Sequence, residues 1–357
     1  MNRCWCFTGA MGENRRVPPR HIALAVLVAV IWGANFVVID LGLGDLPPTL
    51  FVALRFVVVL VPAIALVPRP RVPWRDVLYV GLFMSLGQFA LLYTALSVGM
   101  PAGLASLVLQ AQVVLTVLIA ALTLHERPSR AQVAGIAVGA VGLAVVAAGR
   151  AATTPLVGLV LVVAAATSWA VGNVAARRAA GRAQPPDAVA VDSRRSGFGA
   201  GLSMTVWSAL VVPLPLFALA VVLDGPDEVV HALTHLTVAA VLSTLYTAWL
   251  ASLVGYGIWN TLLAQHRASA VVPYTMLVPV VGLSTAWLVQ GEAPNAWEAA
   301  GGALLLLGVA VTTGVLDPRR QHPRRRHPRR RHPRGDRPSA GVPSAPPAAG
   351  RATTRAR

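Results

Sequence analysis

The sequence predicts an all-α membrane protein with ten transmembrane helices, arranged as two inverted five-helix repeats with both termini in the cytoplasm. Three observations carry this prediction. The chain of 357 residues is 55% hydrophobic and only 12% charged. It divides into apolar segments of about 20 residues, the length that crosses a bilayer core. One sequence pattern recurs 166 residues further along the chain.

The composition excludes a set of ordinary soluble domains. The mean hydropathy is +0.64, and no Asp or Glu occurs between Asp76 and Glu126 or between Glu126 and Asp187. Charge is kept out of segments that lie in lipid because its burial there is costly. The chain therefore belongs to the multi-pass membrane class.

Polar and proline-rich breaks divide the chain into ten apolar segments. The first is too long for the apolar core of a secretory signal and is interpreted as an uncleaved span. The segments are 21–43, 47–68, 74–97, 100–124, 129–149, 155–177, 198–223, 240–264, 268–290 and 294–316.

The recurring pattern combines an acid, a proline and two glycines. In "HERPSRAQVAGIAVGAVG" and "GEAPNAWEAAGGALLLLG" these are Glu126, Pro128, Gly135 and Gly142, and then Glu292, Pro294, Gly301 and Gly308. Small residues at helical spacing favour close packing of helices. Since both segments carry almost no polar side chains, we predict scaffold helices there and a first repeat over 21–150 and a second over 151–316.

Arginine sets the predicted orientation, because cationic loops resist translocation. With the N-terminus inside, the outer segments hold a single arginine, Arg150, whereas the inner segments hold the others that lie outside the spans. Glu126 then ends a span at the inner side and Glu292 ends one at the outer side. The two repeats are therefore predicted to be inverted, as in many transporters.

Polar and aromatic residues at mid-membrane depth are the candidate binding residues, because a polar group in lipid must find a partner. Span one carries Trp32 and Asn35 on one face, and span six repeats the pair as Trp169 and Asn173. The further candidates are Gln88, Tyr93, Gln110, Tyr256, Trp259 and Asn260. Gln110 and Gln112 are about 200° apart on a helix, so both cannot face one cavity.

Each of these residues also has a structural interpretation. An asparagine can simply bond to a neighbouring helix. Arg55, the only arginine well inside a span, can extend its side chain to the outer interface. Alternatively, it can hold a substrate carboxylate with two parallel hydrogen bonds. An ammonium group would then need tryptophan faces, amide oxygens or backbone carbonyls, because no carboxylate lies mid-membrane.

The two ends of the chain have different compositions. Residues 1–20 form a polar leader whose Cys4 and Cys6 support neither a disulfide framework nor a metal site. Residues 317–357 form an Arg/Pro-rich cytoplasmic tail with 13 arginines after Asp317, which we predict to be disordered and to contact anionic lipids. Nucleic-acid binding is the alternative, but no folded module supports it.

No enzyme motif is present, and no cofactor or metal site is predicted. The chain lacks a P-loop, a GxSxG elbow and a paired set of titratable groups within the spans. His231 and His235 have helical spacing but no third ligand. The sequence therefore does not favour a membrane enzyme.

The chain resembles EamA-type members of the drug/metabolite transporter superfamily, from about His21 to Leu316. The resemblance is carried by "WGANFVVIDLGL", "GMPAGLASLVLQAQ", "SWAVGN" and "VGYGIW", and is nearest to the O-acetylserine/cysteine exporter branch. It implies ten helices in two inverted repeats and efflux of such metabolites across an inner membrane by exchange with protons. The residues that fall in family-like motifs are Trp32, Asn35, Arg55, Gln88, Gln110, Trp169, Asn173, Tyr256 and Trp259.

Three functional hypotheses remain open at this stage. The first is export of small amino-acid metabolites, either coupled to protons through Asp40 or Glu126 or uncoupled. The second is broader efflux of amines or drugs, which tryptophan faces would suit. The third, from another class, is a membrane-anchored regulatory protein that acts through its Arg-rich tail. The sequence leaves the oligomeric state undetermined.

Overall fold

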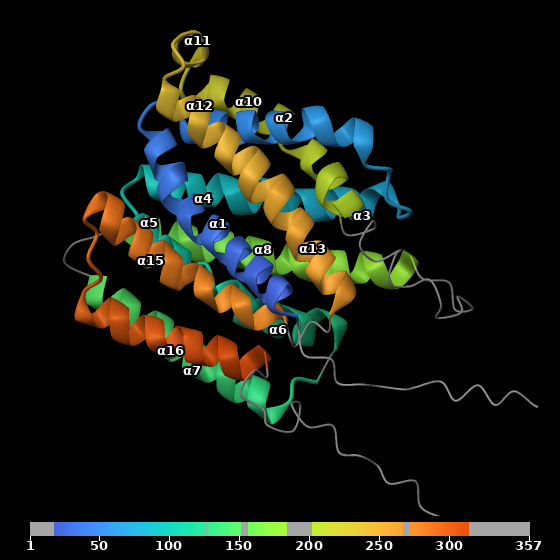
Figure 1. Ribbon diagram of the computed structural model, residues 1–357, viewed down its shortest axis with the longest axis vertical. Coiled ribbons are helices and arrows are strands. Elements are labelled where there is room, and N and C mark those ends of the chain that lie inside the picture. The colour runs from blue at the N-terminus through green and yellow to red at the C-terminus, as the bar shows by residue number, and fades with distance from the viewer. Residues whose placement is uncertain (1–17, 126, 151–155, 184–201, 267–270, 314–357) are drawn as a thin grey trace, which may run out of the picture. The chain divides into compact units, whose positions relative to one another are not determined.

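The computed structural model describes residues 18–125, 127–150, 156–183, 202–266 and 271–313 (Figure 1). These residues all lie within one unit, Met1–Asp317. They form helices and connecting turns, with no strand in the described ranges. The predicted all-α class is therefore confirmed. The leader up to residue 17 and the predicted tail fall outside the described residues.

The elements from the N-terminus to the first glycine-rich helix are α1 (Pro19–Leu43), α2 (Pro48–Leu66), α3 (Trp74–Val80), η1 (Gly81–Gly87), α4 (Gln88–Ser97), α5 (Ala102–Val108), α6 (Ala111–Leu124) and α7 (Arg130–Arg150). The later elements are α8 (Leu156–Ala183), η2 (Ala209–Val211), α10 (Pro213–Leu223), α11 (Pro226–Thr234), α12 (Val238–Leu245), η3 (Tyr246–Gly255), α13 (Tyr256–Gln265), η4 (Val272–Met276), α15 (Leu277–Gln290) and α16 (Ala296–Thr313).

Several neighbouring elements join into membrane-length helices. Among the described residues, seven helices are long and apolar enough to cross a bilayer, and shorter apolar helices cover Arg130–Val146, Tyr274–Gln290 and Ala296–Thr312. These segments coincide with the apolar segments of the sequence. A multi-helix membrane protein is therefore confirmed, whereas ten crossings with both termini in the cytoplasm stay a prediction.

The two glycine-rich helices begin with matching capping boxes. Ser129 Oγ accepts from the Gln132 backbone N–H (3.2 Å), and Gln132 Oε1 accepts from the Ser129 N–H (2.8 Å). Before α16, Asn295 Oδ1 accepts from the Glu298 N–H (2.9 Å), and Glu298 Oε2 accepts from the Asn295 N–H (3.1 Å). Reciprocal bonds of this kind satisfy backbone donors at a helix start. The repeated pattern therefore includes the two helix-start signals.

Helices α7 and α16 pack against each other along their length, at the lower left of the view (Figure 1). A Cβ on Gly142 would lie 2.7 Å from the Gly301 carbonyl oxygen, and one on Gly135 would lie 2.7 Å from the Gly308 carbonyl oxygen. The start of α7 thus meets the end of α16, so the two helices are antiparallel. Only glycine allows this backbone approach.

Two of the long helices contain π-helical segments at corresponding places. Segment η1 lies between α3 and α4 and ends at Gly87, and η3 lies between α12 and α13 and ends at Gly255. A π-helical turn disturbs the regular backbone ladder and is frequent at functional sites. A Cβ on Gly87 would lie 2.5 Å from Oγ of Ser168, and one on Gly255 would lie 2.6 Å from Nε1 of Trp32.

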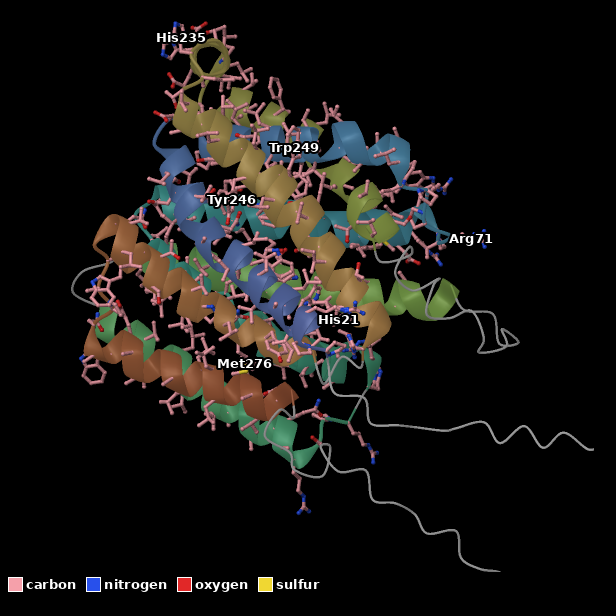
Figure 2. The ribbon with its side chains drawn as sticks, viewed as in Figure 1. His21, Arg71, His235, Tyr246, Trp249 and Met276 are labelled. Atoms are coloured by element: carbon pink, nitrogen blue, oxygen red, sulfur yellow. The ribbon has the colours of Figure 1, made fainter. Side chains whose placement is uncertain are left out.

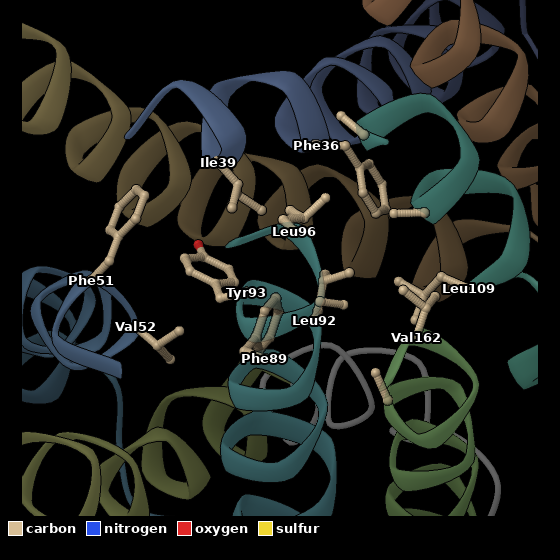
Figure 3. Packing of buried hydrophobic residues seen from close by; sticks show 14 of the residues in the cluster. Phe36, Ile39, Phe51, Val52, Phe89, Leu92, Tyr93, Leu96, Leu109 and Val162 are labelled. Carbon is tan, nitrogen blue, oxygen red and sulfur yellow. The ribbon is translucent and has the colours of Figure 1, made fainter. Parts of the chain in front are cut away.

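The main core extends across most of the helices, and Tyr93 of α4 is fully buried in it beside α2. The Tyr93 ring contacts the Phe51 ring edge-on at 5.1 Å and lies beside Phe89 and Leu92 (Figure 3). Tyr93 and Phe51 are both fully buried. Close-packed aromatic side chains on three helices hold this part of the bundle together.

The segment around His231, which lies between the predicted spans 198–223 and 240–264, forms a short helix, α11. Pro226 stands at its start and Asp227 and Glu228 occupy its first turn, which is the residue pattern that favours helix initiation. The rings of His231 and His235 stack at 4.3 Å. In the part of the chain that the structure describes, no group of three metal-ligating side chains is present.

Candidate functional site

Arg55 lies inside the bundle and is bound by hydroxyl groups from two other helices. It is 2% exposed. Nη1 of Arg55 donates to Oη of Tyr93 on α4, and Nη2 donates to Oγ of Ser252 on η3, both at 3.0 Å. The guanidinium also lies over the Phe89 ring, 4.1 Å from its centroid. The alternative in which Arg55 extends to the outer interface is therefore wrong for this conformation.

Trp32 joins the residues predicted on span eight. Its Nε1 donates to the backbone oxygen of Ala251 in η3 (3.0 Å). Its ring lies 5.1 Å from that of Tyr256 and 5.6 Å from that of Trp259. Spans one and eight thus form an aromatic cluster, defined here as Trp32, Tyr256 and Trp259. Asn260 follows this cluster on α13, and its side chain lies outside the described residues.

The aromatic cluster and Arg55 meet at consecutive residues of one π-helical segment. Ala251 accepts the bond from Trp32, and Ser252 accepts the bond from Arg55. The Ser252 hydroxyl in turn donates to the Thr247 carbonyl oxygen in the same segment (2.8 Å). Segment η3 therefore positions a buried cation and an aromatic surface next to each other.

Trp169 and Asn173 do not join this group. Asn173 Nδ2 donates to Oε1 of Gln112 (3.0 Å) and to Oγ1 of Thr116 (3.3 Å), both on α6. Trp169 is half-buried against the core. The structural interpretation, in which an asparagine bonds to a neighbouring helix, thus describes Asn173 in this conformation. Gln110 turns away from Gln112, as predicted, and its Nε2 donates to the Thr275 carbonyl oxygen (3.4 Å).

Asn35 and Gln88 are buried with incomplete hydrogen bonding. Asn35 is 8% exposed and Gln88 3%. The side-chain oxygen of each has no hydrogen-bond donor within the described structure, and neither does Nε of Arg55 have an acceptor. Buried polar atoms are nearly always paired. These three atoms therefore keep unused hydrogen-bonding capacity inside the bundle.

Apart from Tyr93, the sequence did not identify the residues that surround Arg55. Ser252, Thr247 and Phe89 were absent from the predicted set because a serine, a threonine or a phenylalanine in an apolar span carries little signal by itself. The spacing of Thr247 and Ser252 is five residues, which places their bonding groups on one face only in a π-helical turn. The glycine at the end of that turn, Gly255, was the available signal.

The second π-helical segment makes the corresponding contact in the other part of the chain. Oγ of Ser168 on α8 donates to the Phe83 carbonyl oxygen in η1 (2.7 Å). Phe83 precedes Gly87 by four residues, as Ala251 precedes Gly255. Each π-helical segment therefore presents a carbonyl to the helix that packs against it, α8 or α1.

A histidine pair joins the start of α1 to the end of α13. Nδ1 of His21 and Nε2 of His266 are 2.6 Å apart, and His21 lies in the first turn of α1 (Figure 2). Such a bond requires at least one neutral ring. Burial first, and then the charge of His21, lowers the pKa of His266. The hydrogen bond between His21 and His266 therefore links α1 to the end of α13 only while at least one of the two imidazoles is neutral.

We expect the thermal stability of the purified protein to fall as the pH decreases below about 6.5, the ordinary pKa of histidine. The unfolded chain binds a proton at His266 more readily than the folded chain, so stability is present above that pH and is lost toward the lowered folded pKa. Melting between pH 8 and pH 5 measures this. His266→Asn should flatten the dependence, whereas His235→Asn, an exposed control, should not.

The comparisons with known proteins agree with this arrangement. A model described as the EamA-like transporter family matches the chain twice, over residues 20–148 and 156–314. The chain belongs to this family. It is a transporter rather than an enzyme, and its family membership fixes the general fold.

Curated relatives cover most of this EamA-like chain. A protein of Escherichia coli (strain K12), described as a probable amino-acid metabolite efflux pump, is 40% identical over 290 residues, which are 81% of this chain and 93% of the relative. Its counterpart in Salmonella typhimurium is 41% identical over the same shares. A probable terminal-alkyne amino-acid exporter of Streptantibioticus cattleyicolor is 32% identical, over 80% of this chain and 90% of the relative.

A solved crystal structure supports the fold alone. It overlays with a TM-score of 0.51 at 22% sequence identity, covering 85% of this chain and 99% of the other chain. The EamA-like fold seen here is thus also found in an experimental structure. The binding residues have to be argued from the contacts of this chain.

Proposed function

We propose that this EamA-like transporter exports amino-acid metabolites across the cytoplasmic membrane, with O-acetylserine and cysteine as the first substrates to test. The observation that carries the proposal is the buried Arg55, which has no acidic partner among the described residues and lies beside an aromatic surface. Guanidinium is suited to a carboxylate. The names of the relatives, which are efflux pumps and an exporter for amino-acid compounds, support the same substrate class.

We infer that ten helices in two inverted halves alternate access to this site. The contacts between α7 and α16 support the inversion. Gly135 meets Gly308, and Gly142 meets Gly301. If each residue of the first pair is replaced by the corresponding residue of the other repeat, 166 residues away, the result is the second pair. Such an exchange of partners is the property of a two-fold axis. Combined with the arginine distribution, it favours both termini in the cytoplasm and rocking of the halves.

The proposed substrate-binding residues are Arg55 and Trp32, which donate to η3, together with aromatic and buried polar residues of α1, α4 and α13. Arg55 supplies the cation, the aromatic cluster supplies an apolar surface, and Asn35, Gln88 and Tyr93 complete the polar groups. Gln110, Trp169 and Asn173 bond or pack elsewhere in this conformation. Their role in binding, like that of Asn260, stays a prediction that applies to another state of the cycle.

Transport by purified protein in proteoliposomes tests the proposal. We expect labelled cysteine and O-acetylserine to cross faster than in empty vesicles, and Arg55→Gln to abolish the difference. An imposed proton gradient separates coupled exchange from uncoupled movement. Asp40, whose Oδ2 accepts from Nε2 of Gln290 (2.5 Å), is the described carboxylate to replace if coupling is found. No movement of either compound would contradict the proposal.

Two alternatives give different results in the same assay. A broad amine or drug exporter, which the aromatic cluster would suit, would move cationic amines at least as well as amino acids. A regulatory protein working through its Arg-rich tail would lose its phenotype when residues after Leu316 are deleted. The proposed exporter keeps its flux in that truncated form.

A further inference from the structure

We propose that Asp40 and Gln290 form a contact that closes the outer side of the transporter, and that Arg178 and Thr123 form the corresponding contact at the inner side. These residues act by positioning α1 and α8 and do not touch the substrate. The inference rests on the proposed alternation of access between two inverted halves, and it adds the residues that hold each side shut.

The first observation is that α1 and α8 occupy equivalent places in the two halves. Trp32 on α1 donates to the Ala251 carbonyl oxygen of η3 (3.0 Å). Ser168 on α8 donates to the Phe83 carbonyl oxygen of η1 (2.7 Å). Ser168 directly precedes Trp169, the counterpart of Trp32 in the repeated motif. Each helix therefore makes a polar contact with one π-helical segment near its middle.

The second observation is a charged residue at the same distance along each helix. Asp40 follows Trp32 by eight residues. Arg177 and Arg178 follow Trp169 by eight and nine residues. Both distances are slightly more than two helical turns. In the proposed orientation the acid lies near the outer face of the membrane and the two bases lie near the inner face.

The third observation is that Asp40 and Arg178 each bond to the end of another helix. Oδ2 of Asp40 accepts from Nε2 of Gln290, the last residue of α15 (2.5 Å). Nη2 of Arg178 donates to the carbonyl oxygen of Thr123, the residue before the last one of α6 (2.7 Å). The two bonds thus hold the end of α1 on α15 and the end of α8 on α6.

Helices α6 and α15 are themselves equivalent, because they end in the same way. The residue after α6 is His125, with a φ of 54°, and the residue after α15 is Gly291, with a φ of 73°. Both helices therefore stop in left-handed backbone. His125 and Gly291 are 166 residues apart, which is the interval of the repeated sequence pattern. The contacts of Asp40 and Arg178 are therefore made at equivalent turns of the two repeats.

The outer side is held by fewer hydrogen bonds than the inner side. Helices α1 and α15 lie side by side (Figure 1) and cross at Gly33, where a Cβ would lie 2.8 Å from the Val278 carbonyl oxygen. Among the described residues, the bond between Asp40 and Gln290 is the only side-chain hydrogen bond from α1 to α15. On the inner side, Asn173 adds two bonds from α8 to α6. Opening the outer side therefore breaks one such bond, and opening the inner side breaks at least three.

Two buried valines near these contacts can report when either side opens. Val37 lies between Gly33 and Asp40 on one face of α1 and is 2% exposed. Val174 has the same place on α8, five residues after its tryptophan, and is 3% exposed. A cysteine at either position becomes reachable when the end of its helix leaves its partner. The two native cysteines of the chain are first replaced by serine.

Labelling with a membrane-impermeant maleimide tests the proposal, in sealed vesicles of known orientation and without substrate. We expect Asp40→Ala to raise the outside labelling of Val37→Cys by about tenfold or more, because a bond to a charged group is lost. Inside labelling of Val37→Cys, and labelling of Val174→Cys from either side, should not rise. Asn173→Ala combined with Arg178→Ala should raise the labelling of Val174→Cys from the inside alone.

Further variants separate the hydrogen bond from charge and from general loosening. Asp40→Asn keeps an acceptor for the Gln290 amide, so labelling should stay at the level of the unsubstituted contact. Gln290→Leu breaks the same bond from the other partner, and should add little when combined with Asp40→Ala. Asp224→Ala is the matched control, because this acid accepts from Oγ1 of Thr49 (3.3 Å) and lies outside α1 and α15. The melting temperature of each variant checks that it is folded.

The outcomes separate this inference from the proposed function. A rise from both sides in Asp40→Ala, or an equal rise in Asp224→Ala, indicates general loosening and would overturn the proposal. Unchanged labelling in both Asp40→Ala and Gln290→Leu would also overturn it. If both reporters respond from the opposite faces, the contacts stand and the proposed orientation is wrong. If labelling is as expected but neither cysteine nor O-acetylserine crosses proteoliposome membranes, the exporter assignment fails and the two contacts stand.

Discussion

Replacement of Gly142 by leucine is expected to prevent α7 from packing on α16 and to leave little folded protein. Even a Cβ at this position would lie 2.5 Å from the Leu305 backbone nitrogen and 2.7 Å from the Gly301 oxygen. The obstructing atoms are backbone, so no side chain can rotate aside. Overpacking costs about 1–3 kcal/mol where side chains adjust, and we expect more than that here.

The pairing of glycines between α7 and α16 can be tested with double variants. Gly142→Ala and Gly301→Ala disturb one crossing, and Gly135→Ala and Gly308→Ala disturb the other. Gly142→Ala already forces the two helices apart at its crossing. Adding Gly301→Ala at the same crossing should therefore lower the stability by less than Gly301→Ala does as a single variant. Gly142→Ala with Gly308→Ala affects both crossings, and the losses should be closer to additive.

Thermal unfolding in detergent, followed by the fraction that remains monodisperse, measures both effects. Gly257→Ala is the matched control, because its Cβ would meet nothing within 4 Å. Alanine in a helix is also favoured over glycine by about 0.5–1 kcal/mol. If Gly142→Leu melted like Gly257→Ala, the close packing of α7 on α16 would not contribute to stability.

These glycines also show what the sequence can predict. Their spacing indicated close helix packing, which the structure confirms. The predicted segments that begin at 129 and 294 start within two residues of α7 and α16, and the structure adds the capping residues Ser129 and Asn295. Such features depend on short-range chemistry, so they can be read from neighbouring residues.

The site was predictable only in part, for a physical reason. The faces that carry Trp32, Tyr256 and Trp259 could be recognised by helical spacing, and the structure brings them together. Asn173 lies four residues from Trp169, on the same helical face, yet it bonds to Gln112. Which helix packs against a face is a long-range property, and a π-helical turn changes the face on which later residues lie. The helical repeat of 3.6 residues predicts neither which helix packs against a face nor where a π-helical turn occurs.

Replacement of Trp32 by alanine is expected to abolish export. The indole contacts Tyr256 and Trp259 and donates to the Ala251 oxygen in η3. Without it, the carbonyl freed by the π-helical turn has no donor, and a cavity opens beside Ser252, which orients Arg55. Truncating a fully buried tryptophan costs about 3–5 kcal/mol, and we expect a smaller loss here because Trp32 is partly buried. A loss of even 1.4 kcal/mol of transition-state stabilisation lowers a rate about tenfold.

Trp32→Phe separates the ring from the hydrogen bond. It retains most aromatic contact but leaves the Ala251 carbonyl without its donor, which costs about 1–3 kcal/mol for a buried group. Trp207→Phe is the matched control, since Trp207 Nε1 donates to the Val67 carbonyl oxygen (3.0 Å) away from the site. We expect both variants to melt at similar temperatures, with export in proteoliposomes reduced about tenfold only for Trp32→Phe.

The comparison distinguishes two roles of η3. If Trp32→Phe exports at the wild-type rate while Trp32→Ala does not, the aromatic surface contributes to transport and the bond to Ala251 does not. If Trp32→Phe is impaired but Ser168→Ala is not, the π-helical carbonyl matters only where it supports Arg55, because Ser168 makes the corresponding bond to Phe83 in η1. Impairment of both would instead indicate that the two π-helical segments act together as the halves move, which is the behaviour expected of an inverted pair.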